Sequence, residues 1–189
     1  MTVDISVPIP GHGSPKLLSV FGWIIVHQRN GDDYNWNLGW GYYRNGFGAI
    51  AANFWLGLKR MNALTGSQPY RLRVELQTES GAGRNEWYSA EYWSFAVGDE
   101  VGEKFRLYVA GYSGDAGDKL SHHSGMSFTT KDRDNDQQNE SNCAKDLRGG
   151  WWFKSCHFVC LTCLSTEYRW CSMPGGEQLI VSRMMIKPQ

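Results

Sequence analysis

One stretch decides how the rest of the chain is interpreted. It is F-T-T-K-D-R-D-N-D-Q-Q-N-E-S-N-C-A-K-D-L-R-G-G-W-W-F-K-S-C-H, residues 128–157. An acidic alternation, D-R-D-N-D over 132–136, comes first. Two cysteines, Cys143 and Cys156, follow and enclose the aromatic pair Trp151–Trp152. The first hypothesis is therefore a metal-ion loop beside two cysteines that could close a short covalent loop.

The acidic alternation is typical of a calcium loop. Calcium takes roughly six to eight oxygen ligands, and carboxylates at every second position of a tight loop can converge on one ion. Asp132, Asp134 and Asp136 would repel one another without a cation. The stretch is not an EF-hand, because the glycine and the final glutamate of that loop are missing. From the spacing alone, a solvated acidic turn is the alternative.

Several blocks of the chain together resemble one family. F-T-T-K-D-R-D-N-D, N-C-A and G-G-W-W-F-K-S-C-H resemble the calcium loop and adjoining disulfide of fibrinogen C-terminal domains, which ficolins, tenascins, angiopoietin-like proteins and microfibril-associated glycoproteins carry. Further family blocks occur upstream in the right order: G-W-I-I-V-H-Q-R (22–29), Y-R-N-G-F-G (43–48), N-F-W-L-G-L (53–58), L-R-V-E-L (72–76) and F-R-L-Y-V-A-G-Y-S-G-D-A-G-D-K-L (105–120).

The resemblance and the length of 189 residues imply one substantial domain. Residues 1–21 are expected to be a flexible leader, since their first part is rich in proline and glycine. Residues 22–189 are expected to form the domain. The match is clear over 22–157, whereas 158–189 is divergent and shortened and ends in a stretch like the family's closing strand. The leader shows no clear secretion signal, which for an extracellular family points to a truncated chain.

The expected fold class is α+β: a twisted, mainly antiparallel sheet with a short helix and a loop-rich calcium-binding subdomain. The helix is predicted over Asn53–Leu64, with Asn53 as cap, apolar side chains at helical spacing and Gly66 as stop. Residues 35–43 are expected to form a loop and residues 79–85 a hairpin-type loop. Alternating or apolar stretches predict the strands, over Trp23–His27, Tyr70–Gln77, Trp87–Phe95 and Phe105–Gly111.

Composition argues against three functional classes. The formal net charge is zero, from 19 basic and 19 acidic side chains, so no basic excess points to nucleic acid. No apolar run approaches the roughly 18 residues of a membrane span. No nucleophile elbow, H-E-x-x-H motif or P-loop is present, so an enzyme is not expected.

The resemblance implies how calcium would be held. Asp134 and Asp136 match the two aspartates that coordinate calcium by side chain in the family, and Asp132 would support them. Two backbone carbonyls complete the family's protein ligands. The segment from Asp136 to Cys143 is one residue longer than usual, so Gln138 and Glu140 are only candidates for these carbonyls.

The resemblance also implies a shallow pocket for acetylated sugars or an amino-terminal peptide. His157 matches the pocket histidine, and the Ser155–Cys156 peptide bond matches one that is cis in several members. Leu147 stands where lectin-type members often have tyrosine. The family's tyrosine-bearing loop is not matched, so Tyr168, with Trp170, is the candidate replacement for the missing wall.

Five cysteines leave their pairing partly open. The family pairs the positions of Cys143 and Cys156, and such a crosslink stabilises by about 3 kcal/mol. A zinc site is a rival interpretation, because C-H-x-x-C-x-x-C over 156–163 with Cys171 has metal-knuckle spacing. Asn139 begins a glycosylation sequon inside the acidic loop.

These observations predict an extracellular, secreted recognition domain with calcium as its cofactor, binding acetylated carbohydrate or an extracellular matrix or receptor protein. The alternative is a structural matrix protein of the same fold with a degenerate pocket. Homo-oligomerisation stays open, because the chain contains none of the collagen-like or coiled-coil stalks that multimerise relatives.

Overall fold

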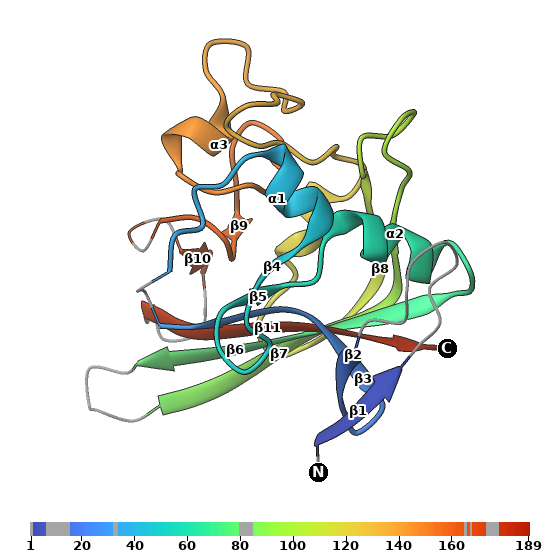
Figure 1. The fold of residues 1–189 in the computed structure, drawn as a ribbon. Coiled ribbons are helices and arrows are strands. Elements are labelled where there is room, and N and C mark those ends of the chain that lie inside the picture. The colour runs from blue at the N-terminus through green and yellow to red at the C-terminus, as the bar shows by residue number, and fades with distance from the viewer. Residues whose placement is uncertain are drawn as a thin grey trace.

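A twisted antiparallel sheet organises the molecule (Figure 1). The computed structural model describes residues 2–6, 16–31, 34–79, 85–164, 166, 168–172 and 178–189. Within these residues the strands of the main path, in spatial order, are β1 (Thr2–Ser6), β2 (Lys16–Val20), β3 (Trp23–Asn30), β11 (Gln178–Pro188), β6 (Tyr70–Glu79), β7 (Asn85–Val97) and β8 (Leu107–Gly114). The α+β class and the mainly antiparallel sheet are confirmed.

The closing strand β11 lies in the middle of this sheet rather than at an edge. Met184 pairs with His27 of β3 on one side and with Val74 of β6 on the other. The sheet therefore forms only once the two ends of the domain meet. Strands β6 and β7 form a hairpin in which Glu79 pairs with Asn85. The loop predicted over 79–85 thus connects a hairpin, and its residues 80–84 lie outside the described part.

Strands also occur in the segment expected to be a leader. β1 and β2 pair with each other, and β2 continues onto β3 through Ser19–Ile24 and Val20–Trp23. The structure therefore differs from the leader predicted over residues 1–21. Residues 7–15 lie outside the described part.

The predicted helix is shorter than expected. α2 spans Leu58–Thr65, and Gly57 precedes it with a φ of 102°, a conformation that favours glycine. Asn53 is not its cap; its side-chain oxygen instead accepts a hydrogen bond from the Asn30 N–H at 2.9 Å. The helix starts late because β5 (Phe54–Trp55) pairs with both β3 and β4 (Phe47–Gly48). The predicted stop at Gly66 is confirmed.

A second helix replaces the predicted loop over 35–43. α1 spans Trp40–Asn45 and buries Trp40 and Tyr43. The loop prediction is wrong for these residues because a partner from far along the chain supports the helix start. Asp132 accepts a hydrogen bond from the Trp40 N–H at 2.8 Å. A side chain on Gly39 would collide with the Asp132 carboxylate, so this close approach requires glycine.

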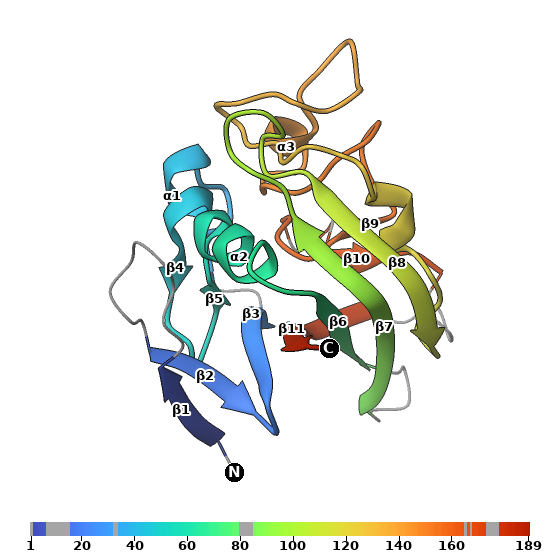
Figure 2. The same ribbon diagram turned by 90° about the vertical axis from the view of Figure 1, so that its right-hand side faces the viewer.

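The loop-rich part of the chain packs over the sheet through aromatic side chains. Trp152 lies 5.9 Å from Trp55 and 5.1 Å from Phe128 between ring centroids, and all three rings are fully buried. Figures 1 and 2 show α3 (Cys143–Asp146) and the segments around it above the sheet, on the same side as α1 and α2. A 3₁₀ helix, η1 (Leu120–His123), and the pair β9 (Val159–Cys160) and β10 (Arg169–Trp170) complete this region.

Candidate functional site

The acidic loop is held by its own carboxylates. The Asp134 side chain accepts a hydrogen bond from the Asp136 N–H at 3.2 Å. Asp136 accepts two more, from the N–H of Gln138 at 2.8 Å and the N–H of Cys143 at 3.0 Å. The two aspartates therefore lie side by side, and Asp136 closes the loop onto the start of α3.

Asp132 links the acidic loop to α1. One oxygen accepts hydrogen bonds from the Trp40 N–H and from the Thr130 hydroxyl at 2.7 Å. Arg133 places its guanidinium 4.0 Å from the centre of the Trp40 ring. Burial raises the pKa of Asp132, but these hydrogen bonds outweigh it and lower that pKa below its usual value. The loop is thus tied to α1 as an anion.

The paired carboxylates carry an electrostatic cost. Burial, together with the negative charge and hydrogen bonding of Asp134, raises the pKa of Asp136 despite the two N–H donors. Within the described residues no three His, Cys, Asp or Glu side chains converge on one point. The Glu140 carboxylate therefore does not join the pair. Gln138, Asn139 and Glu140 are all exposed. The role of the Gln138 and Glu140 backbone carbonyls as calcium ligands stays a prediction.

Two disulfides stabilise the region. Cys143 and Cys156 are bonded, as the resemblance implied, and the side chain of Asn142 caps α3 by accepting from Lys145 N–H at 3.0 Å. Cys160 and Cys163 form a second disulfide. The zinc interpretation is therefore wrong for the oxidised chain, because three of its four proposed cysteine ligands, Cys156, Cys160 and Cys163, are bonded in disulfides. Of the five cysteines, Cys171 has a free thiol.

The three predicted pocket residues are all at least half-buried. His157 is half-buried, with its ring centroid 6.2 Å from that of Phe153. Leu147 is also half-buried and packs on the hydrophobic core. Tyr168 is only 5% exposed and lies beneath the Arg29 guanidinium at 3.9 Å. Tyr168 therefore does not form the open aromatic wall that was expected.

Trp170 is not an open wall either. It is 2% exposed, and its indole N–H donates to backbone carbonyls of Ala116 and Gly117. The predicted cis bond at Ser155–Cys156 is also wrong, because the described residues contain no cis peptide bond. Tyr168 and Trp170, the two aromatic side chains expected to replace the pocket wall, are thus both buried in the interior.

A buried histidine that the sequence did not reveal organises the same region. His123 is fully buried, and its Nδ1 lies 2.8 Å from the Trp152 carbonyl oxygen. Its Nε2 lies 3.2 Å from the backbone nitrogens of both Phe158 and Val159. Burial lowers the pKa of His123 to about 4, with the positive charges of neighbouring His and Lys side chains contributing. No motif surrounds this histidine in the sequence, so only its packing reveals it.

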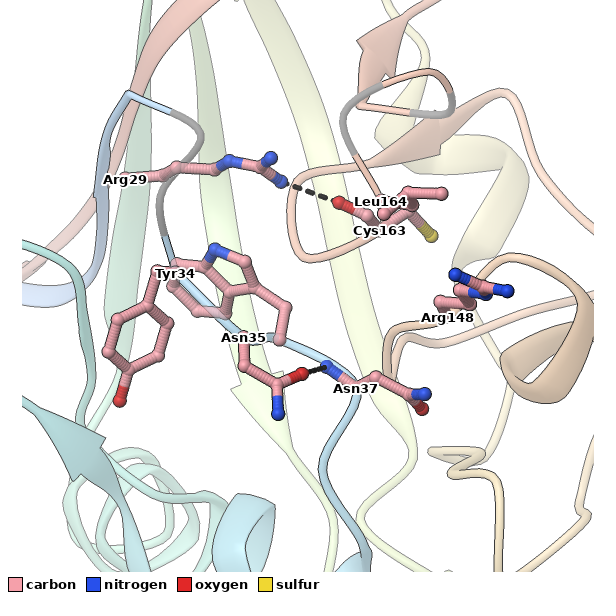
Figure 3. A pocket seen from close by; sticks show the side chains of 8 residues that line it. Arg29, Tyr34, Asn35, Asn37, Arg148, Cys163 and Leu164 are labelled. Atoms are coloured by element: carbon pink, nitrogen blue, oxygen red, sulfur yellow. Dashed lines mark hydrogen bonds between the residues drawn. The ribbon is translucent and has the colours of Figure 1, made fainter.

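A cleft of about 170 Å³ lies between β3, the segment that follows it and the second disulfide (Figure 3). Arg29 forms one wall; it is 1% exposed and donates to the Cys163 carbonyl oxygen at 2.6 Å. The Lys131 ammonium donates to the Asn37 carbonyl oxygen at 2.7 Å, which connects this cleft to the acidic loop. The lining consists of Arg29, Tyr34, Asn35, Trp36, Asn37, Arg148, Cys163 and Leu164.

This composition suits a small polar group. The Asn side chains and Arg148 offer N–H donors, while Trp36 and Leu164 offer apolar surface. The Asn35 side-chain oxygen is already occupied by the Asn37 N–H at 3.0 Å. Sequence patterns did not predict this cleft, because its walls come from segments more than a hundred residues apart.

Comparison with known proteins gives one consistent result. The family described as fibrinogen beta and gamma chains, C-terminal globular domain, matches residues 19–186. Fibrinogen C domain-containing protein 1 of Macaca fascicularis is 41% identical over 182 residues, covering 88% of this chain and 41% of that protein. The chain thus spans about two fifths of that relative's length.

Solved structures agree. The fibrinogen-like globe domain of human ANGPTL6 is 28% identical with a TM-score of 0.85, covering 100% of this chain and 90% of that one. Lamprey fibrin D-dimer, complexed with the peptide ligand Gly-His-Arg-Pro-amide, is 27% identical with a TM-score of 0.76, covering 88% of this chain and 61% of that one. Within the described residues, no helix is long and apolar enough to cross a bilayer.

Proposed function

Because the chain belongs to the family of the fibrinogen C-terminal globular domain, we propose that it is a calcium-dependent extracellular recognition domain. The family is of an extracellular type and is typically used for recognition or structure rather than catalysis. The ligand is an acetylated glycan or a matrix or receptor protein. The peptide ligand of lamprey fibrin supports a recognition role for this fold.

One observation carries the calcium part of the proposal. Asp134 and Asp136 lie next to each other in a loop closed by the Asp136–Cys143 hydrogen bond and the adjoining disulfide. Burial, and then the negative charge of Asp134, raise the pKa of Asp136, and a divalent cation would relieve the repulsion between the two carboxylates. These two side chains would hold calcium, with the carbonyls of Gln138 and Glu140 as further candidate ligands. The bound ion would order the loop and perform no chemistry.

The ligand would lie next to this loop. Two surfaces are available: the half-buried His157, and the Arg29–Arg148 cleft, which Lys131 joins to the loop. An acetamido group needs an N–H donor for its carbonyl and an apolar contact for its methyl, and the cleft lining contains both. His157→Ala and Arg148→Ala variants would distinguish the two surfaces.

A thermal melt in calcium and in chelator tests the calcium site. Calcium at about a hundred times its dissociation constant adds roughly 2.7 kcal/mol, which is roughly 5–10 °C for a domain of this size. Asp134→Asn/Asp136→Asn should abolish the shift, since both charges are lost. Asparagine at 134 can still accept the Asp136 N–H, whereas asparagine at 136 can accept only one of the two N–H groups that Asp136 binds. Asp146→Asn, at the end of α3, is the matched control. Equal shifts in all three proteins would refute the proposal.

The second candidate is a structural matrix domain without a working pocket. The burial of Tyr168 and Trp170 favours it, because the expected aromatic wall is then absent. Retention on an acetylated resin, reversed by free acetate, supports recognition of acetyl groups. If the protein is not retained on the resin but calcium still raises its Tm, the structural candidate is supported.

A further inference from the structure

A second cleft, of about 220 Å³, lies between the end of α1 and the first turn of α2, two helices that lie next to each other (Figure 2). Three cationic side chains and one amide line it: Arg44, Lys59, Arg60 and Asn45. No carboxylate contributes to the lining. Unlike the cleft beside the acidic loop, this cleft has no aromatic or apolar residue in its lining, and the proposed calcium site does not involve it.

Arg60 is fixed in place without losing its charge. Its Nη1 donates to the carbonyl oxygens of Asn45 at 2.6 Å and Leu56 at 3.0 Å. These neutral acceptors orient the guanidinium, and no other residue in the described part of the chain accepts from its remaining N–H groups. Among the described residues, the salt bridges involve neither Arg60 nor Lys59. Both side chains are half-buried, so their charges are screened less than those of fully exposed residues.

Arg44 and Asn45 complete the donor set. Glu100 accepts two hydrogen bonds from the Arg44 Nε, at 2.9 and 2.7 Å, and the Asn45 side-chain oxygen accepts one from Nη1 at 3.0 Å. Among the described residues, the Asn45 NH₂ group and the Arg44 Nη2 have no acceptor and remain as donors. Glu100 compensates one of the three cations, which leaves an excess of positive charge beside the cleft.

This concentration of charge opposes stability. The first turn of α2 contains Lys59 and Arg60, no acidic residue and no side-chain cap, although the start of a helix favours negative charge. The chain has a formal net charge of zero, so the cluster does not follow from a generally basic surface. A bound anion would remove the repulsion between the cations.

We propose that this cleft binds a sulfate group of an acidic extracellular polysaccharide. Guanidinium groups form paired, charge-assisted hydrogen bonds with oxyanions, and Arg60 is already oriented for them. The volume accommodates one sulfate with part of its sugar, while the rest of the chain would run over the surface. The extracellular type of the family favours a polysaccharide over a phospholipid headgroup, the other common source of a tetrahedral oxyanion.

Heparin binding by the full chain at low salt tests the proposal, with affinity measured by calorimetry. Lys59→Gln/Arg60→Gln should bind about tenfold more weakly. Lys59→Glu alone should show a similar loss and avoids disturbing the backbone contacts of Arg60. Lys119→Gln removes the same charge next to η1 and should bind like the unchanged protein. Equal affinity of the unchanged protein and Lys59→Glu would overturn the proposal.

Three further measurements identify the ligand group and the site. Desulfated heparin should not bind, and equal binding would overturn the assignment to sulfate. Vesicles of phosphatidylserine and phosphatidylcholine should not compete with heparin, and stronger binding to vesicles would overturn the assignment to a polysaccharide. Chelator should leave heparin affinity unchanged. Loss of affinity in chelator would place the anion near the acidic loop and refute this site, whereas failure of the calcium melt alone would leave it standing.

Discussion

His123 should make the domain sensitive to acid. A carbonyl oxygen only accepts, so the Nδ1 beside Trp152 carries the proton, and Nε2 must accept from the N–H groups of Phe158 and Val159. A protonated imidazole has no acceptor, so it loses both of these bonds. Burial also removes the water that would solvate the positive charge of the imidazolium. The pKa of His123 is therefore lowered to about 4.

The magnitude follows from linkage. With a pKa near 6.5 in the unfolded chain and about 4 in the folded one, the unfolded state binds more protons between these values. Stability is therefore lost as the pH falls through this window. Between pH 7.5 and 5.0 the loss attributable to His123 is about 2 kcal/mol, or roughly 4–8 °C in Tm. His27, whose pKa burial and Arg29 lower to about 3, adds a similar loss.

The assay is urea unfolding at pH 7.5 and 5.0 with the disulfides intact. His123→Gln should lose about 1–3 kcal/mol at pH 7.5, because glutamine cannot satisfy all three backbone groups. Its further loss on acidification should be about 2 kcal/mol smaller than that of the unchanged protein. His122→Gln, at an exposed neighbouring position, is the control. It should retain most of the pH dependence, although burial and Lys154 lower the pKa of His122 as well. An identical pH dependence in His123→Gln, or a measured His123 pKa near 6.5, would refute the reasoning.

Three other changes have distinct expected outcomes. In chelator, Asp136→Ala should lower the free energy of unfolding, measured in urea, by about 1–3 kcal/mol, because the Cys143 N–H loses its acceptor. An equal loss in Asp134→Ala would contradict this reason. Gly149→Ala should prevent folding or lower Tm by roughly 6–12 °C, which corresponds to an overpacking cost of about 3 kcal/mol, because its Cβ would collide with the Thr162 carbonyl oxygen. Gly41→Ala, with no atom within 4 Å of the new Cβ, should instead stabilise α1 by about 0.5–1 kcal/mol.

Local patterns predicted the features that depend on neighbouring residues. The alternation of β6 between buried and partly exposed side chains is confirmed over Tyr70–Glu79, because a strand needs only a period of two to bury one face. The stop of α2 at Gly66 is also local. The predictions that failed depend on contacts distant in the sequence. Asn53 does not cap the helix because the residues after it pair with β3, and residues 40–43 are helical because Asp132 accepts a hydrogen bond from the Trp40 N–H.

The acidic loop was the most predictable part of the candidate site. D-x-D spacing placed Asp134 and Asp136 side by side, and the resemblance supplied the Cys143–Cys156 pairing. The pocket was predicted poorly, because no local pattern shows which side chains the folded chain buries. Tyr168 became interior, and the cleft lined by Arg29 and Arg148 was not foreseen.

The sequence alone determined the family, the strand and cysteine spacing, and the place of the acidic loop, since each is encoded within a short window. Only the tertiary structure decided which histidine is buried, which disulfide forms at 160–163, and where clefts open. Arg29 of β3 and Cys163 of the second disulfide, separated by 134 positions, meet through a hydrogen bond that forms only in the folded chain. Long-range contacts of this kind depend on the whole chain's burial, and no local period encodes them.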